Sequence, residues 1–222
     1  MVRMLIRFSL VLLGLILVLS FSACQSSGPV TNSTDLAGTV QQDITYSLAD
    51  GADLKLDIHY PNVVNGPVPT VVYVHGGAWI QGDKEEGAGT VDMPALLAAG
   101  FAVVAVNYRL APEYKFPAMI EDVKCAIRFL RANAGRFGLA TERIGAYGGS
   151  AGGHLASLLG LTDSSAGWDS GEYAEYSSRV QAVVDMFGPT NLMGPFPAEA
   201  PVKCEDVFST RDVNGTVLRA AS

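Results

Sequence analysis

The chain has 222 residues, of which 49% are hydrophobic and 17% are charged. This composition suits one folded domain with a substantial core and excludes a compositionally disordered chain. The formal net charge is −7, and no basic run is longer than a pair. Because binding to phosphate groups needs clustered Lys and Arg, we expect no nucleic-acid partner. The Cys and His residues show no ligand-like spacing, so no metal site is predicted.

The first 24 residues have the pattern of an export signal. A positive start that includes Arg3 precedes the apolar run Phe8–Phe21, which is shorter than the roughly 20 residues of a membrane-spanning helix. Small residues then precede Cys24, which resembles a bacterial lipoprotein cleavage box. We therefore predict a signal peptide over 1–24, a lipid on Cys24, and an exported protein anchored to a membrane of the cell envelope. An ordinary secretory signal, which gives a secreted and soluble protein, is the alternative.

The region after this signal divides into a tether and a domain. Residues 25–40 are rich in Ser, Thr, Gly and Asn and have no apolar period, which is typical of a flexible tether. The folded domain is expected over 41–222. Early in it, apolar and polar residues alternate from Leu54 to His59, as in a strand with one buried face.

Four short segments of this domain are apolar and rich in β-branched residues, as expected for strands of a parallel sheet covered on both faces. They are 70–74, 101–106, 143–147 and 180–184. A helix with one apolar face is predicted from Pro117 onward, between the second and third strands. Alternating buried strands and helices predict an α/β fold with a mostly parallel sheet.

Two cysteines remain after Cys24. Cys125 falls within the predicted helix, where a small buried thiol is the expected state. The spacing of Cys125 and Cys204 leaves open whether they form a disulfide, because sequence distance does not show that two side chains meet.

Residues 148–152 read GGSAG and fit the G-x-S-x-G pattern of a nucleophile elbow. Strand residues precede them, and an apolar helix over 155–161 follows. Ser150 is then expected at the carboxyl edge of the sheet and at a helix N-terminus, where the helix dipole favours developing negative charge. Ser150 is therefore the predicted nucleophile.

A second glycine-rich motif follows the predicted strand 70–74. Residues 75–79 read HGGAW, and the glycines let the backbone approach a reacting oxygen closely. The N–H groups of Gly76, Gly77 and Ala151 are predicted to form an oxyanion hole, the donor set that stabilises a tetrahedral acyl-transfer intermediate.

Three motifs together resemble an α/β-hydrolase esterase: VHGGAW at 74–79, YRLAPE at 108–113 and GGSAGGH at 148–154. The most similar groups are the hormone-sensitive-lipase-like carboxylesterases and the bacterial feruloyl/acetyl-esterase-like hydrolases. The resemblance implies the α/β-hydrolase fold, a Ser-His-Asp triad, no metal, no organic cofactor, and small-molecule ester substrates such as acylated sugars. It also implies architectural roles for the His75 side chain and for residues 108–113.

The triad needs a histidine that takes the proton of Ser150 and an acid that orients this histidine. His59 lies on the polar side of an early strand, His75 belongs to the glycine loop, and His154 lies one turn beyond the nucleophile on its helix. In the resembled family, the acid and the histidine follow two further strands. We therefore expect a C-terminally truncated product whose sheet lacks its last two strands and whose triad acid and histidine lie beyond Ser222. Such a form is expected to have little or no esterase activity.

Two other functions stay open. A serine peptidase of the prolyl-oligopeptidase type shares the elbow, although the HGGAW loop favours esters. A non-catalytic surface lipoprotein that binds a ligand or partner fits the lack of a placed histidine, whereas the intact elbow argues against it. Asp185 and Asp206 follow Ser150 and are candidate acids of a rearranged triad, which still needs a histidine.

Overall fold

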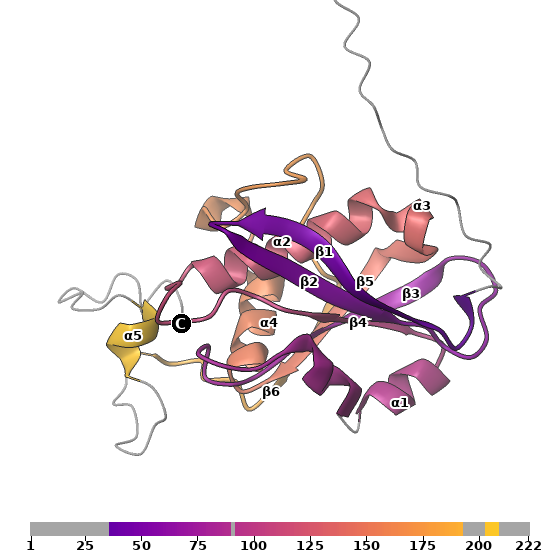
Figure 1. Ribbon diagram of the computed structural model, residues 1–222, viewed down its shortest axis with the longest axis horizontal. Coiled ribbons are helices and arrows are strands. Elements are labelled where there is room, and N and C mark those ends of the chain that lie inside the picture. The colour runs from indigo at the N-terminus through magenta and orange to yellow at the C-terminus, as the bar shows by residue number, and fades with distance from the viewer. Residues whose placement is uncertain (1–35, 90–91, 193–202, 209–222) are drawn as a thin grey trace, which may run out of the picture.

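The computed structural model describes residues 36–89, 92–192 and 203–208, without the side chains of 87–89 and 204. Within these ranges the chain folds into a six-stranded mixed sheet with helices on both faces (Figure 1). This architecture confirms the predicted α/β class. The predicted signal peptide, the lipidation residue Cys24 and residues 25–35 of the tether lie outside the described residues.

The sheet has the strand order β1-β2-β4-β3-β5-β6. The two strands at one edge, β1 and β2, pair in antiparallel fashion, and β2 pairs antiparallel to β4, whereas β4, β3, β5 and β6 are parallel. The bounds are β1 Val40–Ala49, β2 Ala52–His59, β3 Val68–Val74, β4 Ala102–Val106, β5 Leu139–Gly149 and β6 Ala182–Met186. The four apolar segments of the sequence are thus the four parallel strands. β1 was not predicted, because half of its residues are exposed and only two are buried.

Helices connect these strands and cover the sheet. They are η2 Lys84–Gly89, α1 Asp92–Ala98, α2 Ala118–Ala132, α3 Ala134–Phe137, α4 Ala151–Leu161, η3 Ser164–Ala166 and α5 Cys204–Phe208. The predicted helix after Pro117 is α2. Helices α2 and α4 lie on one side of the sheet and α1 lies on the other (Figure 1).

The alternation of strand side chains divides the core into two clusters. Val72 and Val74 of β3 belong to the larger cluster, which the sheet shares with α2 and α4. Tyr73, the residue between them, belongs to a smaller cluster on the other face, together with Met93 of α1. Strands β3 and β4 are therefore covered on both faces, which explains their continuous apolar sequence. The prediction of two covered faces is wrong for β6, which lies at the edge of the sheet and has no buried residue.

The domain begins earlier than the sequence indicates. Leu36 is buried within the larger core cluster, and the backbone N–H of Gly38 donates to the carbonyl of Pro61. Residues 36–40, which the sequence places in the tether, are therefore part of the domain.

Two cations of α2 are anchored by tertiary contacts. Lys124 and Arg128 are fully buried, and each forms an ion pair of 3.1 Å with Asp169. They hold the connection between α4 and β6 against α2. Cys125, beside Lys124, is a buried free thiol as expected.

Candidate active site

The two predicted motifs meet because of the strand order. From β3 the chain crosses to β4 on one side and then to β5 on the other side of β3. The carboxyl ends of strands at such a switch point form the usual binding crevice of an α/β sheet. Val74 and Gly148 are register partners on β3 and β5, so the HGGAW loop and the elbow leave the sheet side by side.

Ser150 occupies a sharp turn between β5 and α4. Its backbone has φ 55° and ψ −122°, a left-handed conformation that residues with a side chain rarely adopt. The residue is exposed, and its backbone carbonyl accepts the first hydrogen bond of α4, from the N–H of His154 at 3.0 Å. The turn therefore presents the Ser150 hydroxyl outward from the sheet edge, at a helix N-terminus.

The predicted oxyanion donors border Ser150. A Cβ built on Gly76 would lie 3.7 Å from the Cβ of Ser150, so the loop passes directly beside the serine. Ala151 is the first residue of α4, and its N–H is one of the four that have no acceptor within a helix. Gly77 has φ 104°, and its carbonyl accepts hydrogen bonds from Ile80 and Gln81 in a tight turn.

The His75 ring is part of the scaffold of this loop. It stacks on the ring of Tyr108, with centroids 4.2 Å apart, and its Nδ1 lies 2.7 Å from the carbonyl oxygen of Gly76. Because a carbonyl only accepts, Nδ1 carries the proton in this contact. Burial lowers the pKa of His75, so the ring is neutral at pH 7.

A second loop supports His75 from behind. Gly82 has φ 112°, and a Cβ there would lie 2.3 Å from Nδ1 of His75. Asn107 fixes this loop, because its side chain accepts from the N–H of Lys84 at 2.6 Å and donates to Asp83 at 2.9 Å. The Lys84 ammonium group is buried and forms an ion pair of 3.1 Å with Asp57. Residues 82–84 are thus structural neighbours of residues 75–79, the HGGAW segment, which is called the oxyanion loop from here on.

Arg109 has the architectural role that the resemblance implies. The carboxylate of Asp122 accepts hydrogen bonds from the backbone N–H, Nε and Nη2 of Arg109. This buried pair joins the segment after β4 to the first turns of α2. Sequence analysis did not indicate this pair, because the two residues lie 13 positions apart along the chain.

The three histidines of the chain lie among the described residues and are engaged elsewhere. The His154 ring packs edge-on against Trp79 and Phe208, with centroids 5.3 and 6.3 Å apart. His59 lies on β2, which β4 and β3 separate from β5. His75 stacks on Tyr108. None of these contacts places a ring at the Ser150 hydroxyl.

The candidate acid Asp185 has structural partners. At the end of β6 its carboxylate accepts hydrogen bonds from the N–H of Gly188 at 2.7 Å and from the hydroxyl of Ser157 at 3.0 Å. It therefore joins α4 to the turn after β6, a role that sequence alone did not indicate. Asp206 lies on the short helix α5.

No group of three His, Cys, Asp or Glu side chains in the described residues is placed to hold a metal ion. Across the same residues, no helix is both long and apolar enough to cross a membrane.

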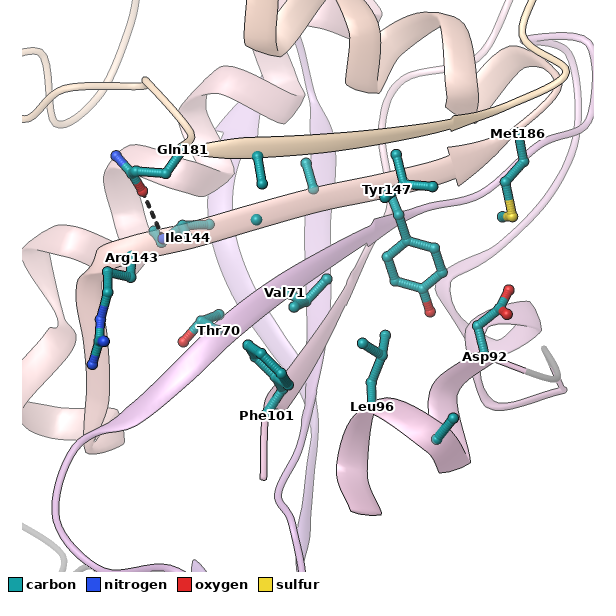
Figure 2. A pocket seen from close by; sticks show the side chains of 15 residues that line it. Thr70, Val71, Asp92, Leu96, Phe101, Arg143, Ile144, Tyr147, Gln181 and Met186 are labelled. Carbon is teal, nitrogen blue, oxygen red and sulfur yellow. Dashed lines mark hydrogen bonds between the residues drawn. The ribbon is translucent and has the colours of Figure 1, made fainter. Parts of the chain in front are cut away.

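A separate apolar groove lies on the sheet face that carries α1. Figure 2 shows its walls, with Tyr147 and Met186 on the sheet and Leu96 on the helix. Its volume is about 610 Å³, and Val184 on its sheet side is 57% exposed. None of the predicted site residues lines this groove.

An exposed serine in a strained strand-to-helix turn, beside a glycine-rich loop at the switch point of a parallel sheet, defines an α/β-hydrolase of the serine type. A family model described as BD-FAE matches residues 56–209. This match covers more than half of the chain, and the chain belongs to the BD-FAE family. The predicted α/β-hydrolase esterase resemblance and the membership of a serine carboxylesterase family are thereby confirmed.

Relatives and solved structures agree with this assignment. Esterase LipC of Mycobacterium tuberculosis is 37% identical over 122 residues, which are 55% of this chain and 30% of LipC. A bifunctional GH43-CE structure from Bacteroides eggerthii has 41% identity and a TM-score of 0.64, over 69% of this chain and 21% of that one. A truncated carbohydrate esterase from gut microbiota has 33% identity and a TM-score of 0.62, over 71% and 59%. The chain spans about a third of the length of the mycobacterial relatives.

Proposed function

We propose that the protein hydrolyses carboxylic esters through an acyl-enzyme on Ser150. The observation that carries this proposal is the close approach of Gly76 to Ser150, which sets backbone donors beside an exposed, strained serine. The serine oxygen attacks the ester carbonyl carbon, and its proton passes by way of a base to the departing alcohol. Water then cleaves the acyl–serine ester and releases the acid. The Gly76, Gly77 and Ala151 amides stabilise the oxyanion in both steps.

None of the three histidines of the chain is placed to act as the base in this mechanism. His154 and His75 are held in aromatic contacts, and His59 lies on a distant strand. We infer that the 222-residue chain alone hydrolyses esters weakly, since removal of a triad member from a serine hydrolase leaves only the catalysis of the oxyanion hole and binding. Both acylation and deacylation are slow in such a form.

An imidazole rescue experiment tests the nucleophile. The full chain is incubated with p-nitrophenyl acetate at a series of imidazole concentrations, with Ser150→Ala as the control for direct hydrolysis by imidazole. We expect imidazole-dependent release of p-nitrophenol above the control, and one acetyl group that peptide mapping places on Ser150. The proposal fails if the two proteins behave alike. Robust turnover without imidazole would instead overturn the inference about the missing base.

Acylated sugars are the proposed substrate class. The similarity to a bifunctional GH43-CE protein and to a carbohydrate esterase from gut microbiota supports a sugar as the alcohol part of the ester. An acetylated monosaccharide should transfer its acetyl group to Ser150 faster than ethyl acetate, a simple alkyl ester of the same acid. Equal rates for the two esters would count against the sugar.

The same reaction separates the two other candidate functions. A peptidase of the prolyl-oligopeptidase type acylates Ser150 from a peptide p-nitroanilide, whereas an esterase reacts with the p-nitrophenyl ester of the same acyl group only. A non-catalytic binding protein leaves Ser150 unmodified by both reagents, with and without imidazole.

We further propose that the protein is exported and anchored to a membrane through a lipid on Cys24. The support is the order of residues 1–24, with a positive start, an apolar run and small residues before the cysteine. In a bacterial host, Cys24→Ser is expected to move the protein out of the lipid-modified membrane fraction, and Cys125→Ser serves as the control. Metabolic labelling with a radioactive fatty acid distinguishes a lipid from a retained signal peptide.

A further inference from the structure

Tyr108 makes contacts that go beyond the architectural role expected of its motif. The residue follows β4 and is buried, yet its hydroxyl reaches the loop that follows β3. It lies 3.0 Å from the carbonyl oxygen of His75 and 3.3 Å from that of Gly76. One side chain thus holds two consecutive peptide groups of the oxyanion loop.

These two peptide groups carry the predicted oxyanion donors. In a planar trans peptide the C=O of one residue and the N–H of the next point in opposite directions. The carbonyl of His75 therefore sets the direction of the Gly76 N–H, and the carbonyl of Gly76 sets that of the Gly77 N–H. When both carbonyls face the Tyr108 hydroxyl, both N–H groups point away from it.

The loop also borders Ser150. A Cβ on Gly76 would meet the carbonyl of Gly149 at 3.1 Å and the Cβ of Ser150 at 3.7 Å. Glycine itself has no side chain with which to hold its peptide groups in place. The loop therefore depends on its neighbours for the orientation of its amides.

The hydroxyl has few alternative arrangements. The Tyr108 ring is fixed by its stack on His75, at an interplanar angle of 11°, and Nδ1 of His75 donates to the Gly76 carbonyl that Tyr108 also contacts. Burial raises the pKa of Tyr108 far above its ordinary value, so the phenol keeps its proton and donates throughout the working pH range.

We propose that Tyr108 is a positioning residue, whose hydroxyl orients the Gly76 and Gly77 amides toward the oxyanion formed at Ser150. This role rests on the proposed esterase function, because it concerns the same oxyanion. Preorganised donors act only if they need no reorientation during the reaction. Loss of the Tyr108 hydroxyl should therefore slow the acylation of Ser150 without weakening ester binding.

The test compares Tyr108→Phe with Tyr60→Phe. Tyr60 is the matched control, because its buried hydroxyl also donates to a backbone carbonyl, that of Phe137 at the end of α3, at 2.8 Å. Both variants lose one phenol hydroxyl and keep the ring. Because both variants lose a buried hydrogen bond, a difference between their properties reflects the position of the lost hydroxyl.

The first readout is independent of catalysis. In the full chain with ¹⁵N-labelled glycine, kept in detergent micelles because of its apolar residues 8–21, Tyr108→Phe should shift or broaden the amide signals of Gly76 and Gly77. Tyr60→Phe should leave both signals in place. Unchanged Gly76 and Gly77 signals in Tyr108→Phe overturn the proposal, whatever the activity of the chain.

The second readout is the rate constant of imidazole-assisted acylation of Ser150. It is measured with p-nitrophenyl acetate and with the matching thionoester, in which a sulfur that accepts hydrogen bonds poorly replaces the carbonyl oxygen. Tyr108→Phe should reduce the oxoester rate constant about tenfold, less than the roughly hundredfold effect of losing an oxyanion donor, with little change in the half-saturating ester concentration. The thionoester rate constant should change less, so the ratio of the oxoester to the thionoester rate constant falls.

A ratio equal to that of Tyr60→Phe overturns the role of Tyr108 and leaves the esterase proposal intact. Absence of Ser150 acylation in the parent chain refutes the esterase proposal, and the amide signals still decide whether Tyr108 orients the loop.

Discussion

The Cα of Gly152 lies so near the backbone carbonyl of Val74 that a Cβ on Gly152 would stand 2.0 Å from the carbonyl oxygen. This contact seats the first turn of α4 on the end of β3 and thereby fixes Ser150 beside the oxyanion loop. We expect Gly152→Ala to lower the free energy of unfolding by about 3 kcal/mol or more, because backbone atoms have to move. Urea denaturation measures the change. Gly135→Ala is the control, since a Cβ there meets open space; a similar loss in both variants would contradict the close packing.

Ser150 is expected to store backbone strain. At φ 55°, glycine has no steric penalty, whereas a residue with a side chain is usually strained. Ser150→Gly should therefore be more stable than Ser150→Ala by about 1 kcal/mol in thermal or urea unfolding. The same pair of substitutions at Ser157, in the middle of α4, should give the opposite order, because glycine is a poor helix former. Equal stability of Ser150→Gly and Ser150→Ala would show that the turn is unstrained.

Acid should destabilise the oxyanion loop through His75. Burial lowers the pKa of His75 below its ordinary 6.5, so the unfolded chain binds this proton more readily than the folded one. The stability contribution is complete above about pH 6.5 and declines as the pH falls toward the lowered pKa.

His75→Asn tests this pH dependence, because the amide keeps a donor near the position of Nδ1 and does not titrate. Between about pH 7 and pH 5, the melting temperature of the variant should fall less than that of the parent chain. The half-buried His59, whose pKa burial also lowers, gives the comparison variant His59→Asn. A slope that is unchanged in His75→Asn would exclude His75 as the titrating group.

The apolar groove beside α1 should bind hydrophobic probes. Val184 on the sheet wall of the groove is 57% exposed, so we expect the fluorescent dye ANS to bind to this apolar surface. We also expect the chain to associate with itself, because exposed apolar surface and open sheet edges favour association. Val184→Lys should reduce dye fluorescence and the sedimentation of aggregates. Val63→Lys, at a 69% exposed site outside the groove, should change neither. Equal effects of the two lysines would place the dye elsewhere.

Local patterns predicted the parallel strands well. The apolar run at 70–74 lies within β3, and the segment 143–147 lies within β5, because burial on both faces demands apolar residues without interruption. The edge strand β1 and the core position of Leu36 were missed. An edge strand exposes many of its side chains, and one leucine in a polar segment carries no period.

The candidate site was predictable only in its sequence-local parts. Ser150 and Gly76 could be predicted as candidate site residues because an elbow and a glycine loop need particular residues at adjacent positions. The anchoring of Lys124 by Asp169 and the joining of α4 to the β6 turn by Asp185 were not found. These contacts link residues that lie far apart in sequence, and only the folded chain brings them together.

The sequence by itself predicted the candidate site residues: a serine in an elbow and glycines whose amides approach a reacting oxygen. Only the tertiary structure decided how these amides are held, because the direction of a peptide group depends on what its carbonyl meets in space. The register of Val74 with Gly148 brings the two motifs together. The hydroxyl of Tyr108, more than thirty residues along the chain from Gly76, then sets the direction of both carbonyls.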